Sequence, residues 1–151
     1  MQTSAVGRGR AGGVSLKTLA CLMVLLLPIA GCGKQGPAMG TVTGKISYTD
    51  GSNPTGGIAV IRFEVASGSS TELRKAASAN IEPDGSYELM TIRPGDGAFY
   101  GDYDVVFTIQ KSYRISKQLV AEKYTLATSS PFQRTIDSPS HVFDFEIEKA
   151  P

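Results

Sequence analysis

The chain has one histidine and two cysteines, which limits the chemistry that it could perform. A Ser/His/Asp triad would have to be built around His141, which follows Ser138-Pro139-Ser140 at the expected start of a strand. No Gly-x-Ser-x-Gly sequence supplies a nucleophile elbow. A zinc site needs three or four histidine, cysteine or carboxylate ligands, and this chain offers few of them. We therefore expect no enzymatic activity, no metal and no cofactor, with His141 placed on the surface or in a turn.

Carboxylates gather in two segments. Asp96, Asp102 and Asp104 lie close together in a glycine-rich stretch. Calcium takes six to eight oxygen ligands, of which this stretch could supply some. The simpler interpretation is that these are solvated acids, with Asp104 on the outer face of its strand. Every second residue of 144–148 is also acidic, which predicts a solvated strand face that discourages edge pairing.

Aromatic side chains could form a surface for a sugar or a protein. Phe99 and Tyr100 fall in an expected loop, and Tyr113 and Tyr124 fall in the weakly patterned segment 111–132. Exposed aromatic patches often mark binding sites. Exposure of these four side chains on one face would favour a carbohydrate-binding module, and burial of all four would remove the basis for it.

The second cysteine, Cys32, follows the most apolar segment of the chain, 19–29. Three basic residues precede that segment, and residues 1–31 contain no Asp or Glu. A positive start, a short apolar stretch and small residues before a cleavage point are the marks of a secretory signal peptide. The sequence Ile29-Ala30-Gly31-Cys32 resembles a bacterial lipobox, in which the chain is cut before the cysteine and the thiol is acylated.

This resemblance implies cleavage between Gly31 and Cys32 and more than one acyl chain on Cys32. The protein would then be anchored to a membrane, outside the cytoplasm. An ordinary cleaved signal and a retained anchor are the alternatives. The apolar stretch 18–31 is shorter than the about 20 residues that a bilayer-spanning helix needs, and it contains Pro28. Gly33 replaces the aspartate associated with inner-membrane retention in some bacteria, which favours the outer membrane.

Removal of residues 1–31, which include Cys21, leaves 120 of the 151 residues, with 12 basic and 14 acidic side chains. This near-neutral balance gives no indication of nucleic-acid binding, and no amphipathic helix or basic patch is evident. Without a second cysteine no intramolecular disulfide can form, so one hydrophobic core must stabilise the chain. The glycine- and proline-containing residues 32–40 predict a flexible tether, followed by a domain over residues 41–149.

From Thr41 onward, apolar and polar residues alternate between turn signals, which predicts about seven short strands and no long helix. The expected strands are 41–48, 58–66, 73–81, 86–92, 103–110, 133–137 and 141–148. A phase slip near Ile61 suggests a β-bulge, and Pro83-Asp84-Gly85 predicts a tight turn that closes a hairpin over 74–92. Segment 111–132 is expected to be a long loop with a short helical turn at 119–124.

These elements predict a single all-β domain, a seven-stranded antiparallel β-sandwich with Greek-key connections. Alternation predicts that Tyr87 and Tyr103 are core residues. It also directs the apolar residues of 143–147 inward, against those of 103–109.

Several motifs resemble those of carboxypeptidase regulatory-like, or transthyretin-like, domains. Thr41-Val42-Thr43-Gly44-Lys45-Ile46 is similar to their first strand. Ile81–Leu89 and Gly101-Asp102-Tyr103-Asp104-Val105 are similar to their hairpin and following strand. Glu122-Lys123-Tyr124 and Thr128-Ser129-Ser130 resemble the late loop of small bacterial lipoproteins of this type.

The resemblance covers about residues 40–149 and implies a prealbumin-like sandwich that serves as an accessory module. Transthyretin-like hydrolases resemble one another in several histidines and a C-terminal Tyr-Arg-Gly-Ser, whereas this chain ends Glu148-Lys149-Ala150-Pro151. We therefore expect a non-enzymatic cell-envelope lipoprotein that acts as a structural or protein-interaction module. Its partners would be a membrane, through the lipid on Cys32, and an envelope protein. A carbohydrate- or peptidoglycan-binding module on the same fold is the alternative.

Overall fold

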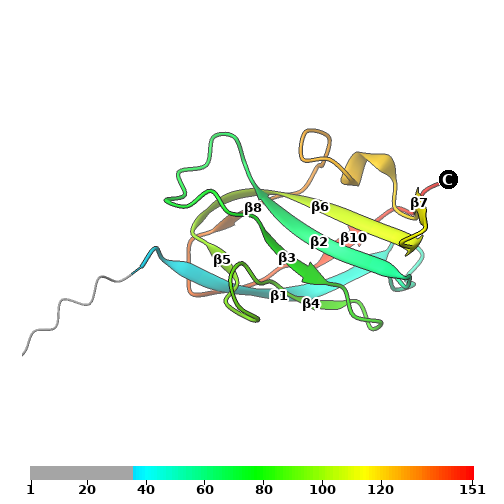
Figure 1. The fold of residues 1–151 in the computed structure, drawn as a ribbon, viewed down its shortest axis with the longest axis horizontal. Helices are drawn as coiled ribbons and strands as arrows, with labels where there is room; N and C mark the ends of the chain where they lie inside the picture. The colour runs from blue at the N-terminus through cyan, green and yellow to red at the C-terminus, as the bar shows by residue number, and fades with distance from the viewer. Residues whose placement is uncertain (1–35) are drawn as a thin grey trace, which may run out of the picture. The chain divides into compact units, whose positions relative to one another are not determined.

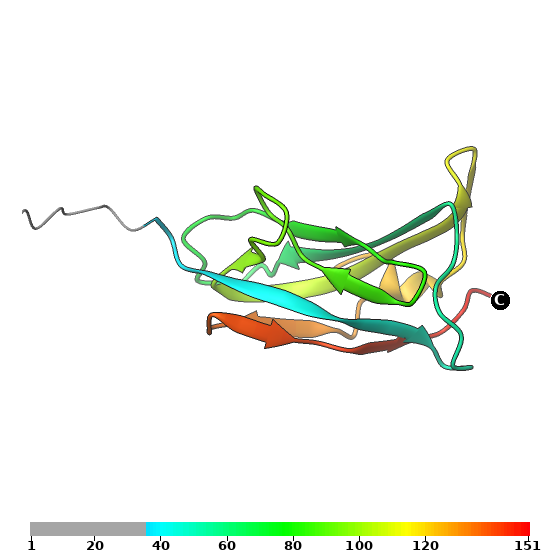
Figure 2. The same ribbon diagram turned by 90° about the horizontal axis from the view of Figure 1, so that it is seen from below.

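Two β-sheets face each other across an apolar core in residues 36–151, the part of the chain that the computed structural model describes (Figures 1 and 2). These residues form ten strands and one short 3₁₀ helix. The elements are β1 (Met39–Tyr48), β2 (Ile58–Val65), β3 (Ala77–Asn80), β4 (Ser86–Glu88), β5 (Ala98–Phe99), β6 (Gly101–Ser112), β7 (Ile115–Gln118), η1 (Glu122–Tyr124), β8 (Gln133–Ile136), β9 (Ser140–Val142) and β10 (Phe145–Ile147). In these residues, no helix is long and apolar enough to cross a bilayer.

β1 is the central strand of the first sheet. β4 and β5 pair with it antiparallel on one side, and β9 and β10 pair with it parallel on the other. The second sheet has the order β3-β2-β6, with β7 and β8 both paired to β6. The predicted all-β sandwich is therefore confirmed. The strand count is higher than predicted because 98–99 and 115–118 form strands that were not expected, and because a break divides the last predicted strand into β9 and β10. The parallel pairs of β1 depart from an all-antiparallel sandwich.

The core forms where the two sheets face each other. Alternate residues of β6 point inward, and Tyr103, Val105, Phe107 and Ile109 are all buried, as the alternation predicts. The ring of Phe107 meets that of Phe145 from the opposite sheet at 5.7 Å between centroids. Burial of each such side chain stabilises the fold by roughly 1.5–3 kcal/mol.

The sheets are joined at two places along their edges. Ser78 and Met90 form an isolated antiparallel bridge with both backbone hydrogen bonds at 2.9 Å. Val120 and Lys149 form a second bridge at the opposite side. The predicted hairpin over 74–92 is therefore only partly correct, because β3 and β4 belong to different sheets and this segment crosses from one sheet to the other.

Other predicted boundaries also differ from the structure. β1 starts at Met39 rather than Thr41. β2 keeps a continuous register with both neighbours, so the bulge predicted near Ile61 is wrong. The register shift lies instead between Gln110 and Ser112. Segment 111–132, predicted as a loop, contains β7 as well as the helical turn that was expected there.

Two hydrogen bonds fix the break between β9 and β10. They involve Lys45, from the motif 41–46, and Tyr87, from the motif 81–89. The Asp144 carboxylate accepts a 2.7 Å hydrogen bond from the Lys45 backbone N–H. The Tyr87 hydroxyl donates to the Phe143 carbonyl at 2.7 Å. A Cβ on Gly44 would meet that carbonyl at 1.9 Å, so only glycine permits the approach.

Candidate functional site

Gly31 and Cys32, the residues predicted for cleavage and lipidation, lie outside the described residues. Of the four aromatic residues proposed as a ligand surface, Phe99 and Tyr124 are buried, with 3% and 4% of their surface exposed. Tyr100 is half-buried and Tyr113 is 88% exposed. With two of the four buried, these side chains do not form the shared exposed surface that would favour a carbohydrate-binding module.

Both buried aromatics are held by specific neighbours. Phe99 pairs with Met39 in the first sheet, and its carbonyl accepts a 2.9 Å hydrogen bond from the Tyr103 hydroxyl. The 3₁₀ helix η1 lays Tyr124 against Phe132, with the rings stacked at 5.4 Å. Strand β5 has two residues and η1 has three, so neither is long enough to produce a periodic sequence signal.

His141 closes a turn. Its Nε2 accepts hydrogen bonds from the backbone N–H groups of Asp137 at 3.3 Å and Ser138 at 3.2 Å. The Ser138 hydroxyl lies 3.0 Å from the same nitrogen, and the ring stacks on Phe143. The Asp137 carboxylate also approaches Nε2, at 3.5 Å, instead of orienting the ring through Nδ1 as the acid of a catalytic triad does. The arrangement is that of a turn cap, as the sequence suggested.

Asp96 closes a second turn. Its carboxylate accepts three backbone N–H bonds, from Thr91 at 2.7 Å, Ile92 at 3.0 Å and Arg93 at 2.8 Å. Partial burial acts to raise the pKa of this carboxyl, but the three N–H bonds outweigh it and the pKa is lowered. Both carboxylate oxygens are thus committed to the protein's own backbone.

The other two carboxylates of the calcium hypothesis also have partners. Asp102 accepts a 2.6 Å bond from the Thr135 hydroxyl, and Asp104 accepts a 2.9 Å bond from the Gln133 side-chain amide. Within residues 36–151, no group of three metal-ligating side chains is placed to hold an ion. The three acids stabilise turns and strand pairs instead.

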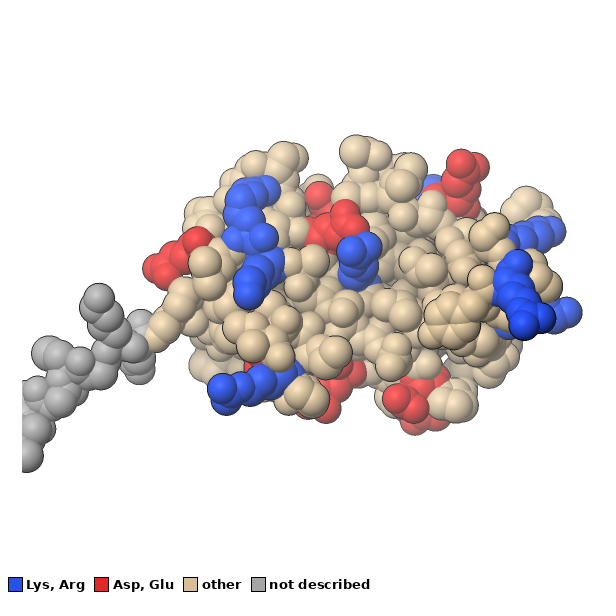
Figure 3. Space-filling model, in the orientation of Figure 1, with Lys and Arg blue, Asp and Glu red and all other residues tan. Residues whose placement is uncertain are grey.

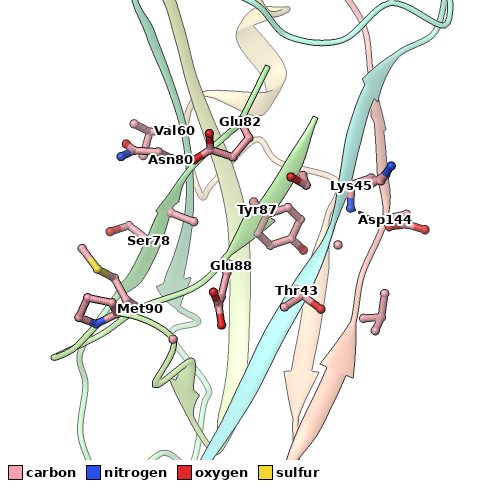
Figure 4. Close-up of a pocket in the computed structure, with 16 residues that line it drawn as sticks. Thr43, Lys45, Val60, Ser78, Asn80, Glu82, Tyr87, Glu88, Met90 and Asp144 are labelled. Carbon is pink, nitrogen blue, oxygen red and sulfur yellow. Dashed lines mark hydrogen bonds between the residues drawn. The ribbon is translucent and has the colours of Figure 1, made fainter. Parts of the chain in front are cut away.

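A groove of about 950 Å³ runs along β4, between the edges of the two sheets (Figure 4). It is lined by residues of β3, of the first sheet and of the loops beside them, including Ser78, Asn80, Glu88, Met90, Lys45 and Asp144. The groove lies where β3 and β4 separate, between the Ser78–Met90 bridge and the turn closed by the hydrogen bond from the Glu82 N–H to the Ser86 carbonyl.

The chemistry of this groove is that of a polar contact surface. Glu82, Glu88 and Asp144 line it together with one cation, Lys45. Met90 is 47% exposed at one end of it and adds an apolar contact. This mixture suits a partner that offers hydroxyl, amide or positively charged groups. Sequence patterning did not indicate the groove, because its lining comes from strands that were expected to pair.

A basic surface that the sequence analysis missed lies at the hairpin between β6 and β7. We call residues 111–117 the hairpin tip. Lys111, Arg114 and Lys117 are exposed there, and Lys and Arg side chains gather at this end of the molecule (Figure 3). Tyr113 and Ile115 expose apolar surface between them. The only sequence signal was the absence of Asp and Glu from 105–121.

No family model matches the chain, and no curated protein or solved structure shows significant similarity to it.

Proposed function

We propose that this protein is a lipid-anchored, non-enzymatic module of the bacterial cell envelope. In this proposal the chain is cleaved between Gly31 and Cys32 and acylated on Cys32. The transthyretin-like sandwich then acts outside the cytoplasm by binding an envelope protein.

The short distance along the chain from Cys32 to the first strand carries the proposal. β1 begins at Met39, so only residues 33–38 separate the lipobox-like cysteine from an ordered sheet. Seven residues of fully extended chain, at up to about 3.6 Å each, span at most about 25 Å. Acylation of Cys32 would thus hold the whole sandwich next to the membrane, which suits a module that presents a fixed surface to neighbouring proteins.

The polar side chains considered for catalysis hydrogen-bond to the protein's own backbone, which supports a binding role rather than catalysis. His141, Asp96 and Tyr87 each satisfy backbone groups of turns or strand breaks. Among the described residues, no buried side-chain nitrogen or oxygen is without a hydrogen-bond partner. A catalytic site typically contains groups held ready for a substrate, whereas these groups maintain the scaffold.

The lipid anchor can be tested with matched cysteine variants. Cys32→Ser should abolish acylation and cleavage, so that mass spectrometry of the membrane fraction finds the uncleaved chain. Cys21→Ser, which changes the other cysteine in the apolar segment, should give the same acylated mass as the parent, beginning at Cys32. Normal processing of Cys32→Ser would contradict the lipobox assignment.

The binding role can be tested in the groove beside β4. A photo-crosslinking residue at Asn80, which lines the groove, should capture a defined envelope protein in intact cells. The same residue at the exposed Thr128 provides the control, because Thr128 lies outside the groove. Equal labelling from both positions, or none from Asn80 in correctly acylated protein, would argue against an interaction module that uses this groove.

A further inference from the structure

The cations of the hairpin tip are free of acidic partners. Lys111, Arg114 and Lys117 take part in none of the ion pairs formed within residues 36–151. No Asp or Glu occurs between Val105 and Ala121, so the tip has no acid of its own. Three positive side chains are therefore available to an external anion.

The tip also exposes apolar groups between its charges. Tyr113, at the turn, is 88% exposed, and Ile115, at the start of β7, is 49% exposed. Tyrosine is enriched at membrane–water interfaces, where its ring sits at the level of the headgroups. Lys and Arg beside it can keep their charges among anionic headgroups while their aliphatic stems pack lower.

The position of the hairpin tip and the charge on the rest of the molecule would together orient the protein on a charged surface. Figure 2 shows the hairpin bending away from β1 and the C-terminal strands, on the side of β2 and β3. The first sheet carries more acidic than basic side chains. Asp84, Glu88, Asp144 and Glu146 are exposed on its strands and turns, against Lys45, Arg93 and Lys149. An anionic plane would attract the hairpin tip and repel the first sheet.

We propose that the hairpin tip docks on an anionic lipid bilayer, with Tyr113 in the headgroup layer and Lys111, Arg114 and Lys117 against anionic headgroups. This orients the sandwich with its first sheet away from the membrane. The proposal extends the lipid-anchoring function and rests on it for the supply of a nearby membrane. Each cation near such a surface favours the docked state by about fivefold.

A single tryptophan can report docking, because the chain contains none. The full chain with Tyr113→Trp is reconstituted on vesicles of phosphatidylcholine alone or of phosphatidylcholine with phosphatidylglycerol. Flotation establishes that the N-terminal segment holds the protein on both. We expect blue-shifted emission and quenching by brominated lipid only on the anionic vesicles, with loss of both effects at high salt.

Two variants control this measurement. Val142→Trp places the reporter at a site that is 69% exposed on β9, in the first sheet, and its emission should not depend on lipid charge. Replacement of Lys111, Arg114 and Lys117 by alanine in the Tyr113→Trp protein should lower the ratio of docked to undocked protein by about a hundredfold. Unchanged circular dichroism ensures that the fold is kept.

The outcomes separate the two proposals. Protein that does not float with the vesicles would refute lipid anchoring. Docking of the hairpin tip would then be tested from the tryptophan emission of the Tyr113→Trp protein with added vesicles. Tyr113→Trp protein that floats but shows identical tryptophan emission on both vesicles would overturn the docking proposal alone. An emission shift of the same variant with poly-glutamate in detergent, without one on anionic vesicles, would also overturn it and identify an acidic polypeptide as the partner.

Discussion

At the scale of single residues, the same tripeptide builds two turns in different surroundings. In Asp50-Gly51-Ser52 and Asp84-Gly85-Ser86, the aspartate carboxylate accepts hydrogen bonds from both the backbone N–H and the hydroxyl of the serine. Both glycines have positive φ, +78° and +83°. They differ in contacts: a Cβ on Gly51 would meet nothing within 4 Å, whereas one on Gly85 would lie 2.4 Å from the Ile46 carbonyl oxygen.

This difference predicts unequal effects of the same substitution. Gly51→Ala should destabilise the protein by about 1 kcal/mol, through the left-handed backbone conformation alone. Gly85→Ala should cost about 1–3 kcal/mol more, because the Ile46 carbonyl must move as well. Urea denaturation of both variants measures the difference. Equal losses would mean that the Gly85 turn tolerates the added methyl group.

At the scale of elements, β8 contributes a cation that covers an aromatic cluster. The Arg134 guanidinium carbon lies 4.8 Å from the ring centroid of Phe145, 5.4 Å from that of Phe143 and 5.9 Å from that of Phe132. These rings come from the loop before β8, from β10 of the other sheet and from the break that precedes β10. Arg134 thus closes the side on which β8 and β10 approach each other without sharing a ladder.

Removing the Arg134 side chain should destabilise the fold. Arg134→Ala is expected to lower the free energy of unfolding by about 1–2 kcal/mol, because it removes cation–π contacts and apolar stem packing. Arg62→Ala is the control, since Arg62 is exposed and its ion pair with Glu64 at 3.4 Å should contribute less than about 1 kcal/mol. Similar thermal shifts for the two variants would show that the aromatic contacts of Arg134 add nothing.

Strands in which every second residue is apolar and faces the core could be predicted from the sequence. Elements whose position depends on contacts between the two sheets could not. In β6 every second residue from Tyr103 to Ile109 is apolar and buried, and this side was assigned correctly. β7 escaped detection because a register shift precedes it and Ile115 is exposed. The crossing between β3 and β4 was taken for a simple hairpin, since its turn residues would suit either arrangement.

The candidate site residues divide in the same way. The caps made by His141 and Asp96 use local contacts, and the sequence correctly suggested ordinary turn roles for them. Phe99 is buried by pairing with Met39, sixty positions away, which no local pattern indicates. The hairpin tip was missed because its cations are spaced along the chain and only the hairpin brings them together.

At the scale of the whole molecule, buried tyrosines make stability sensitive to alkaline pH. Burial raises the pKa of Tyr87, and the negative charge of Asp144 adds to this while Arg134 opposes it. Burial also raises the pKa values of Tyr48 and Tyr103. Since the unfolded chain would release these protons near pH 10, the stability is complete below that pH and falls as pH rises toward the folded-state values.

We therefore expect alkaline unfolding above about pH 10, coincident with phenolate absorbance. Tyr87→Phe should flatten the pH dependence and, because its hydrogen bond to the Phe143 carbonyl is lost, lower stability at neutral pH by about 1 kcal/mol. Tyr113→Phe, which changes a phenol exposed at the hairpin tip, is the control. Phenolate absorbance that rises fully before circular dichroism changes would contradict this coupling.

The central position of β1 has a mechanical consequence. A pull on the N-terminal end of the described residues enters the fold at Met39, in a strand flanked by neighbours on both sides. If the opposing load acts at the hairpin between β6 and β7, it is directed along β1, across hydrogen bonds that run roughly perpendicular to the strand. Such bonds must shear together instead of unzipping one by one. Under such a load, β1 would therefore resist extraction from the sheet.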